Sequence, residues 1–311
     1  MSRRTVVIAN PRSRNGATGR RMDAVVAKLR ATLGEVAIET TRGPRDAERI
    51  AREAVGRGAL RVLVAGGDGT TSEVVTGLLA GGLAERVELG LLPLGTGGDL
   101  ARTLGLPRDL DEAIARLARG KTRRVDAGAA RFQADDGAER TLFFVNVASA
   151  GISGLVTALV NAAPKSLGGT VSFLVGTLRA IVRFEPAGAR IRVDGAVVHE
   201  GPLTLAVAAN GRYFGGGMHV APEAGIDDGL LDVVWIDGLP KLRLLRELPK
   251  LYTGAHLRVS AVHSTRGRVV EIEPLEGTRP LRIEIDGEPL GSLPARFEVL
   301  PAALTLVGCE A

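Results

Sequence analysis

The stretch "VLVAGGDGTTSEVV", from Val62 to Val75, decides the fold class of the first half of the chain. Four apolar residues come before Gly66 and a helix-forming segment follows, so the glycines stand between a predicted strand and a predicted helix. Glycine allows the backbone at such a turn to come close to another group. The stretch therefore raises two questions: what the loop approaches, and why Asp68 stands in its middle.

Segments on both sides of this loop alternate between strand and helix. Apolar, β-branched runs predict strands at 5–10, 35–41, 61–65 and 87–94. Segments with helical spacing or helix-end signals predict helices at 19–34, 44–58, 71–82 and 109–120. This alternation is typical of a parallel sheet with helices on its faces.

The residues after about 125 have a different pattern. Most of them read as alternating strands joined by Gly, Asp and Pro turns. The Asp-Gly pairs in "VDGAVV" and "IDGEPL" predict two β-hairpins. The sequence therefore predicts an α/β domain over 1–127 and an antiparallel β-sandwich or barrel domain over 128–311.

Composition limits the class of partner. The 311 residues include 40 Lys and Arg against 35 Asp and Glu, a net charge of +5 that fits an anionic nucleotide or an acidic membrane surface. A basic protein without such a partner fits equally well. Aromatic residues make up only 3%, too few for a single-stranded nucleic-acid platform, and the charge is too diffuse to indicate DNA. We therefore expect no nucleic-acid partner.

Cysteine usage and apolar runs indicate the compartment. Cys309 is the only cysteine, which rules out a disulfide within the chain and favours a reducing cytoplasm. The apolar run after the first four residues is too short for a signal peptide, so we expect a first strand there. The apolar stretch 141–163 is broken by glycines and polar residues, which favours a strand, a turn and a short helix over a membrane span.

The segment from Leu239 to Val259 mixes leucines with lysines and arginines. A basic amphipathic segment can lie on an anionic membrane. The alternative is a surface helix packed on the strand domain, and on these residues alone that alternative is favoured.

Three glycine-containing loops follow predicted strands of the first domain: "NPRSRNGATG", "GGDGTTS" and "PLGTGGDLAR". Ligands bind outside the carboxyl ends of the strands in an open parallel sheet. Exposed backbone N–H groups and helix N-termini at such loops favour phosphate. The loops therefore predict a site for a phosphorylated ligand.

The two common nucleotide motifs are absent. A dinucleotide fingerprint from Gly67 would need glycine where Ser72 stands, and a P-loop ending at Gly120 would need glycine at Ala115. Asp68 would repel a bare phosphate, so it indicates a Mg²⁺ ion or a positioned hydroxyl beside the phosphates. An Asp-Gly turn without a ligand is the alternative.

"GGDGT" followed by "PLGTGGDLAR" resembles the diacylglycerol kinase catalytic family, whose members include bacterial lipid kinases, with sphingosine and ceramide kinases as relatives. "NPRSRNG" resembles the first loop of that family. "NGRYFGGGMHVAPEAGIDDGLLDV" resembles its second-domain signature, and "IDGEPL" resembles its catalytic turn. The resemblance covers nearly the whole chain in order.

The resemblance implies a fold like those of NAD kinase and diacylglycerol kinase, with ATP in a cleft and γ-phosphoryl transfer to a lipid hydroxyl. The expected acceptor is diacylglycerol, which would give phosphatidic acid. Glu288 matches the proton acceptor, and Asp68 is a second candidate catalytic residue. The positions matched to nucleotide contacts are Thr41, Gly66, Gly67, Asp68, Gly69, Thr70, Thr71, Ser72 and Thr96. The positions matched to bound Mg²⁺ are Gly225, Asp228 and Leu230.

A lipid substrate implies a cytoplasmic protein that associates peripherally with membrane surfaces, and a homodimer is one option for its assembly. Two positions depart from the family pattern: Gly98 and Ser72 each replace an asparagine. These losses keep two further hypotheses open. One is a kinase of another lipid or of a soluble hydroxyl compound, such as a sphingoid base or NAD. The other is a nucleotide-binding regulatory protein without turnover.

Overall fold

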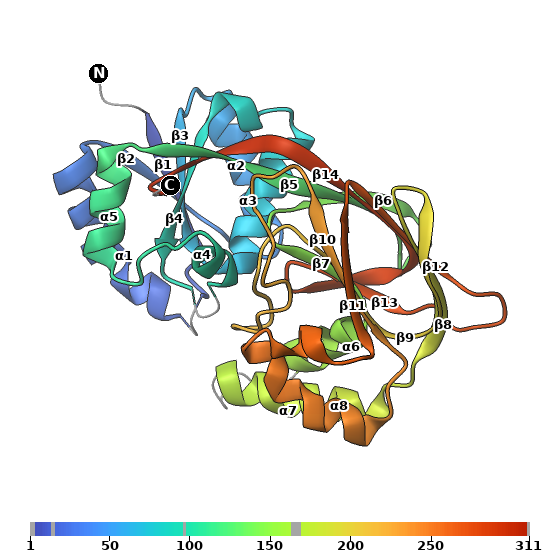
Figure 1. Ribbon diagram of the computed structural model, residues 1–311. Coiled ribbons are helices and arrows are strands. Elements are labelled where there is room, and N and C mark those ends of the chain that lie inside the picture. Colours follow the sequence, from blue (N-terminus) through green and yellow to red (C-terminus); the bar gives the residue numbers. More distant parts are fainter. Residues whose placement is uncertain (1–3, 14–15, 96–97, 163–168, 310–311) are drawn as a thin grey trace. The chain divides into compact units, whose positions relative to one another are not determined.

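The computed structural model describes residues 4–13, 16–95, 98–162 and 169–309, and the chain divides into two compact units (Figure 1). The first unit comprises Met1–Ala127 and Pro301–Ala311, and the second comprises Gly128–Leu300. The sequence predicted a second domain running to residue 311, and the structure corrects that end. The last part of β14 (Glu288–Val307) pairs in parallel with β4 (Glu88–Pro93) of the first unit, Thr305 opposite Glu88.

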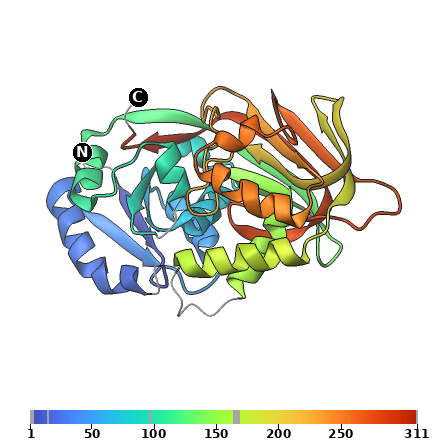
Figure 2. The ribbon, with the colours of Figure 1, turned by 60° about the horizontal axis from the view of Figure 1, so that its bottom comes forward.

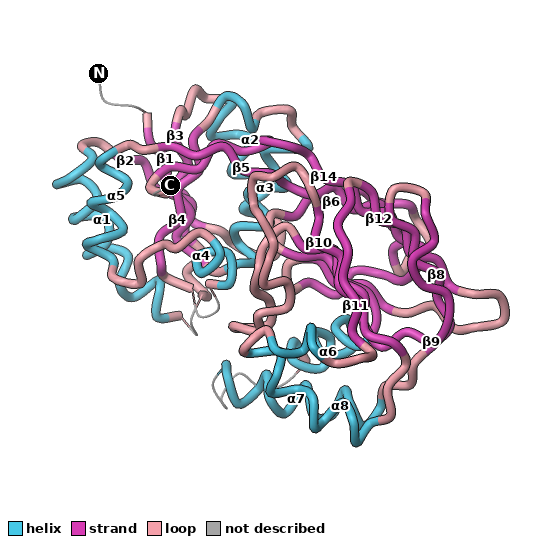
Figure 3. Tube along the Cα trace, in the orientation of Figure 1, coloured by secondary structure: helices cyan, strands magenta, loops and turns pink. Residues whose placement is uncertain are grey.

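The first unit is built on parallel strands. β1 (Thr5–Ala9) pairs in parallel with β2 (Val36–Thr40) and with β3 (Arg61–Gly66), and β3 pairs in parallel with β4. Every residue of β1 and β3 is buried, as expected for strands covered on both faces. Figure 3 shows helices on both sides of these strands. The helices are α1 (Ala17–Leu33), α2 (Asp46–Gly56), α3 (Asp68–Ala80), η1 (Ala84–Arg86), α4 (Asp99–Thr103) and α5 (Leu110–Arg119).

The ends of these helices follow local sequence signals, with one correction. Gly34 follows α1, and Gly120 ends α5 with left-handed backbone, as glycine at a helix C-terminus predicts. The sequence placed the start of α3 at Thr71, whereas the helix begins at Asp68. A carboxylate in the first turn of a helix is favoured by the helix dipole, so Asp68 begins the helix and does not lengthen the loop.

The second unit is an antiparallel β structure. Its ring strands are β7 (Val147–Gly151), β8 (Ala187–Val193), β9 (Ala196–Ala209), β12 (Val269–Pro274), β13 (Arg282–Ile285) and β14. Hydrogen-bonded neighbours lead from β7 through β13, β14, β12, β8 and β9 back to β7. Of the two predicted alternatives, sandwich and barrel, these strands form the closed one, which leaves no free edge among the six. Ile191, Leu203 and Phe297 are fully buried in its core.

Four more strands extend this unit. β10 (Leu231–Asp237) pairs with β9, and β11 (Val262–Gly267) pairs with β10. β5 (Thr122–Ala134) pairs with β6 (Glu139–Phe144), and the division between the units falls within β5 and within β14.

Helical segments also belong to the second unit. β7 followed by α6 (Ile152–Asn161) is the predicted strand, turn and helix. The sequence did not predict α7 (Gly169–Arg183). The predicted 239–259 segment is split into α8 (Lys241–Glu247), η3 (Leu248–Tyr252) and η4 (Ala255–Arg258). Pro249 and the left-handed Gly254 interrupt it. Within the described ranges, no helix is both long enough and apolar enough to cross a membrane.

Candidate active site

Three loops of the first unit meet where β1, β3 and β4 end. The Asn10 side-chain amide after β1 donates a hydrogen bond to Thr70 Oγ1 at 3.1 Å. A Cβ atom at Gly95 would lie 2.5 Å from the Cα atom of Gly67, so the loops after β3 and β4 touch backbone to backbone. Only glycine at position 95 permits that approach. The convergence of glycine loops expected from the sequence is present.

Asp68 uses its carboxylate to hold the neighbouring loop. The N–H groups of Asp99 and Leu100 donate to its two oxygens at 3.1 and 3.4 Å. A carboxylate that accepts backbone N–H groups has its charge partly offset by them. From the sequence, a cation or a hydroxyl is expected to compensate Asp68, and the structure adds the backbone of α4 as a partner. A direct catalytic role for Asp68 stays a prediction.

Other predicted nucleotide positions lie at the same edge. Thr41 follows β2, and its N–H donates to the carbonyl of Ala9 at the end of β1 at 2.9 Å. Gly66 ends β3, and the members from Asp68 to Ser72 form the first turns of α3. The Thr71 hydroxyl donates to the Gly67 carbonyl at 3.3 Å. Thr96 lies outside the described residues.

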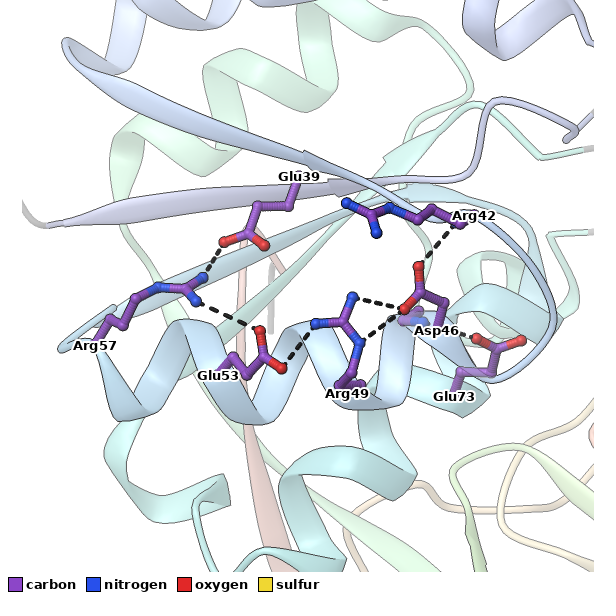
Figure 4. A network of polar contacts seen from close by, with 8 residues as sticks. Glu39, Arg42, Asp46, Arg49, Glu53, Arg57 and Glu73 are labelled. Carbon is purple, nitrogen blue, oxygen red and sulfur yellow. Dashed lines mark hydrogen bonds and ion pairs between the residues drawn. The ribbon is translucent and has the colours of Figure 1, made fainter.

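A polar network fixes the segment between Thr41 and α2 (Figure 4). The N–H of Arg42 donates to Asp46 Oδ2 at 2.8 Å, and Arg49 donates to Asp46 Oδ1 at 2.7 Å. The hydrogen bond from Arg42, followed by that from Arg49, lowers the pKa of Asp46. Asp46 is therefore held as a carboxylate that shapes the turn after Thr41.

α3 is attached to α2 by a second set of contacts. Glu73 accepts a hydrogen bond from the N–H of Ala47 at 3.1 Å, and burial raises the pKa of Glu73 (Figure 4). A Cβ atom at Gly77 would lie 2.3 Å from the carbonyl oxygen of Glu48, so the two helices pack in backbone contact. The helix that carries Asp68 to Ser72 is therefore packed closely against α2.

Gly98, one of the two departures from the family pattern, has a left-handed backbone with φ 66° and ψ 35°. Asparagine adopts this conformation more readily than other non-glycine residues. Among the described atoms, a Cβ at this position would meet only the Cβ of Ala101, at 3.8 Å. The replacement of asparagine by glycine therefore keeps the backbone shape and removes only a side-chain amide.

In the second unit, Glu288 follows a tight, anchored turn. Ile285 and Glu288 pair across the β13–β14 hairpin, and Asp286 (φ 45°) and Gly287 (φ 90°) form the two-residue turn with positive φ. The buried Asp286 carboxylate accepts hydrogen bonds from three successive backbone N–H groups, those of residues 145, 146 and 147, at 3.2, 3.2 and 2.9 Å. Glu288 itself is exposed.

Glu284, in β13 beside this turn, is a candidate site residue that was not predicted from the sequence. It is buried, Ser149 Oγ donates to its Oε2 at 2.7 Å, and the N–H of Gly287 donates to its other oxygen. Burial raises the pKa of Glu284 to about 7, although both hydrogen bonds act in the opposite direction. The available sequence signal was a carboxylate within a strand, on the other side of the Asp286–Gly287 turn from Glu288.

The raised pKa of Glu284 predicts a pH-dependent stability. Above the ordinary pKa of 4.5 the unfolded chain has released this proton, whereas the folded chain keeps it up to about pH 7. The free energy of unfolding should therefore fall as pH rises through this window, by about 3 kcal/mol. Glu284→Gln, which cannot ionise, should lose that part of the dependence. Urea denaturation of both proteins at pH 5 and 8 measures it, and equal pH slopes would contradict the prediction.

The predicted magnesium ligands lie in one turn before β10. Asp228 Oδ1 accepts a hydrogen bond from the N–H of Leu230 at 3.1 Å, and a Cβ atom at Gly225 would lie 2.6 Å from Asp228 Oδ2. Arg266 Nη1 lies 3.9 Å from the same Oδ2. Among the residues that the structure describes, no group of three or more His, Cys, Asp or Glu side chains has metal-binding geometry. The role of the turn in binding Mg²⁺ stays a prediction.

Two family models match the chain. The diacylglycerol kinase catalytic domain matches residues 4–130, and the YegS C-terminal NAD kinase beta sandwich-like domain matches residues 146–308. The matches together cover most of both units.

Curated relatives match over nearly their full length. A diacylglycerol kinase of Mycobacterium tuberculosis (strain H37Rv) is 32% identical over 306 residues, which is 98% of this chain and 94% of the relative. A probable lipid kinase, YegS-like, of Chromohalobacter salexigens is 34% identical over 92% of this chain and 88% of the relative.

Solved structures share the fold. A putative diacylglycerol kinase from Bacillus anthracis str. Sterne superposes with a TM-score of 0.77 at 25% identity, covering 98% of this chain and 97% of that one. Yeast NADH kinase in complex with NADH superposes with a TM-score of 0.58 at 13% identity, covering 100% and 84% of the two chains, which shows a shared fold alone.

Proposed function

This chain belongs to the diacylglycerol kinase family, and from that premise we propose that it transfers the γ-phosphoryl group of ATP to the hydroxyl group of diacylglycerol, giving phosphatidic acid. It is a kinase, and ATP is the co-substrate that its family implies. The convergence of the loops after β1, β3 and β4 carries the proposal for ATP. The curated relative carries the proposal for the acceptor.

The first unit supplies the proposed nucleotide site. Gly66 to Ser72 and Thr41 lie where backbone N–H groups and the N-terminus of the 13-residue α3 favour the phosphates. Thr96 completes the proposed set from the sequence. Positioning of the phosphates supplies most of the catalysis in phosphoryl transfer, which is why rigid loops suit this role.

Glu288 is the proposed general base. As the acceptor oxygen attacks the γ-phosphorus, its proton passes to the Glu288 carboxylate, and the oxygen between the β- and γ-phosphorus leaves on ADP. Asp286 holds the turn before Glu288 through three backbone N–H groups.

Mg²⁺ is the proposed metal. The carbonyl groups of Gly225 and Leu230 and the carboxylate of Asp228 are hard oxygen donors gathered in one turn, which fits this ion. Mg²⁺ neutralises charge on the phosphates when it is bound. We also propose that the protein is cytoplasmic and associates peripherally with the membrane that contains its acceptor.

A transfer assay with γ-labelled ATP and a panel of diacylglycerol, a sphingoid base and NAD tests the proposed function. We expect label in phosphatidic acid. Label only in the phosphorylated sphingoid base would show that the acceptor of the same phosphoryl transfer is a sphingoid base and not diacylglycerol. Label only in the phosphorylated NAD would indicate a kinase of soluble hydroxyl compounds. Bound ATP with no transfer to any acceptor would indicate a nucleotide-binding regulatory protein.

Restoring the family asparagine at position 98 tests the nucleotide loop. Gly98→Asn should fit the left-handed backbone and return a side-chain amide, so we expect a KM for ATP about fivefold lower, the worth of one hydrogen bond. Gly105→Asn is the matched control, because Gly105 is also left-handed (φ 62°) and lies just past the other end of α4. A Cβ atom added at Gly105 would meet no described atom within 4 Å. Steady-state kinetics measures both, and equal KM values for the two variants would contradict the prediction.

A further inference from the structure

Exposed apolar side chains gather on one part of the second unit. Among the described residues, eight large apolar side chains are exposed, and six of them lie on α7, α8 and η3. The six are Leu174, Leu178, Val182, Leu242, Leu245 and Tyr252, and we call them the α7–α8 face. Leu242 is 80% exposed and Val182 65%. Single exposed apolar residues are ordinary, whereas a cluster marks a binding surface.

The two helices of this face lie side by side. Figures 1 and 2 both show α7 along α8, and the Lys241 ammonium group donates to the Val182 carbonyl at 2.6 Å. Leu174, Leu178 and Val182 repeat every four residues, which places them on one side of α7. Ala180 and Ile181 of the same helix are buried. α7 is therefore apolar on its packed side and also on its outer side.

The same segments concentrate positive charge. Gly169–Arg183 and Lys241–Tyr252 contain six basic residues and one acidic residue, a net charge of +5 that equals the net charge of the whole chain. The six are Arg179, Arg183, Lys241, Arg243, Arg246 and Lys250. The acidic residue, Glu247, pairs with Arg246 at 2.9 Å and with Lys250. Basic side chains around exposed aliphatic ones are the composition of surfaces that bind anionic bilayers.

We propose that the α7–α8 face docks this protein on an anionic lipid bilayer, with its leucines and Val182 among the headgroups and the basic residues of the same segments at the lipid phosphates. The proposal rests on the proposed function, since an acceptor with two acyl chains is reached in the bilayer. Charge complementarity favours a bilayer over a second copy of the chain. In a symmetric dimer built on this face, two surfaces of net charge +5 would oppose each other.

The test is co-sedimentation with vesicles, without ATP and without acceptor. We expect binding to vesicles of phosphatidylcholine with phosphatidylglycerol, weaker binding in high salt, and little binding to phosphatidylcholine alone. The double variant Val182→Glu/Leu242→Glu should bind at least about tenfold more weakly, because it loses two apolar contacts and two units of net charge. Both side chains point largely into solvent, and glutamate favours helices, so the fold should persist.

Val197→Glu is the matched control. Val197 is 48% exposed in β9 of the same unit, outside the α7–α8 face. Vesicle binding by this variant should therefore weaken only by about the effect of one added negative charge. Equal weakening in the control and the double variant would overturn the proposal. So would a wild-type protein that does not bind anionic vesicles, or a wild-type dimer that the double variant dissociates in sedimentation analysis.

Activity on a short-chain diacylglycerol in solution separates this inference from the proposed function. The double variant should keep the wild-type rate on that acceptor and lose at least about tenfold on acceptor embedded in vesicles. A wild type that is inactive on every acceptor but binds vesicles contradicts the proposed function alone. A wild type that is active in solution but does not bind vesicles overturns the docking proposal alone.

Discussion

Replacing Glu288 with glutamine is expected to lower kcat for lipid phosphorylation by about 100- to 10,000-fold, the usual contribution of a general base. Glutamine has nearly the shape of glutamate but does not take the proton of the acceptor hydroxyl. Glu288 is an exposed residue at the start of β14, so the replacement should leave the hairpin folded. Labelled-phosphate transfer measures kcat, and equilibrium binding of ATP should be unchanged because the proposed phosphate contacts lie elsewhere.

Glu276→Gln is the control for that experiment. Glu276 is likewise an exposed glutamate beside a glycine in the second unit, so the variant removes the same charge without touching the β13–β14 hairpin. Its kcat should equal that of the wild type. If Glu288→Gln retains wild-type kcat, Glu288 is not the general base. If neither the wild type nor Glu288→Gln transfers phosphate to any acceptor, the hypothesis of a nucleotide-binding regulatory protein gains support.

Replacing Asp286 with alanine is expected to lower the free energy of unfolding by at least about 4 kcal/mol, counting about 1 for each of the three donors and about 1 for the backbone. Three buried backbone N–H groups would lose their acceptor, and an unmet buried donor costs about 1 to 3 kcal/mol. Alanine also fits the left-handed backbone at this position poorly, which adds about 1 kcal/mol. Because the same turn carries Glu288, kcat should fall as well at temperatures where the variant is folded.

Asp286→Asn and Asp194→Ala separate stability from activity. Asparagine tolerates a left-handed backbone and keeps one acceptor oxygen, so Asp286→Asn should lose less stability than Asp286→Ala. Asp194 occupies the other Asp-Gly hairpin with φ 49°, and its carboxylate accepts the N–H groups of Arg268 and Val269. Asp194→Ala should therefore lose only about 2 kcal/mol, about 1 from the left-handed backbone and about 1 from the two hydrogen bonds, because its turn is exposed, and kcat should be unchanged. Denaturation and transfer assays measure these effects, and an Asp194→Ala variant as inactive as Asp286→Ala would contradict the account.

At the candidate site, the conformation of the glycine loops could be predicted from the sequence. The runs containing Gly66, Gly67 and Gly95 predicted close backbone approach at strand ends, and the structure places a hypothetical Cβ of Gly95 against Gly67. This close approach could be predicted because glycine permits local backbone conformations and close contacts that other residues do not. The hydrogen-bond donors to Asp68 could not be predicted, because the N–H groups of Asp99 and Leu100 lie 31 and 32 residues away in the sequence.

In the second unit, the sequence predicted the local elements but less of how they pair and pack. Alternation along the strands predicted a β-rich domain, and the Asp-Gly pairs predicted both hairpins. The closed ring was one of two predicted alternatives, whereas the helix α7 and the return of the last residues to the first unit were not predicted. Each depends on which distant segments pair or pack, and strand alternation carries no information about the choice of partner strand.

For this chain the sequence by itself determined the loop chemistry, the alternation of elements and the family, because backbone preferences and motif spacing act over a few residues. The tertiary structure alone decided that Asp286 clamps the turn before Glu288, that burial brings the pKa of Glu284 to about 7, and that α7 joins α8 in one exposed apolar and basic face. Burial, desolvation and long-range hydrogen bonds arise only when segments far apart in the chain come together.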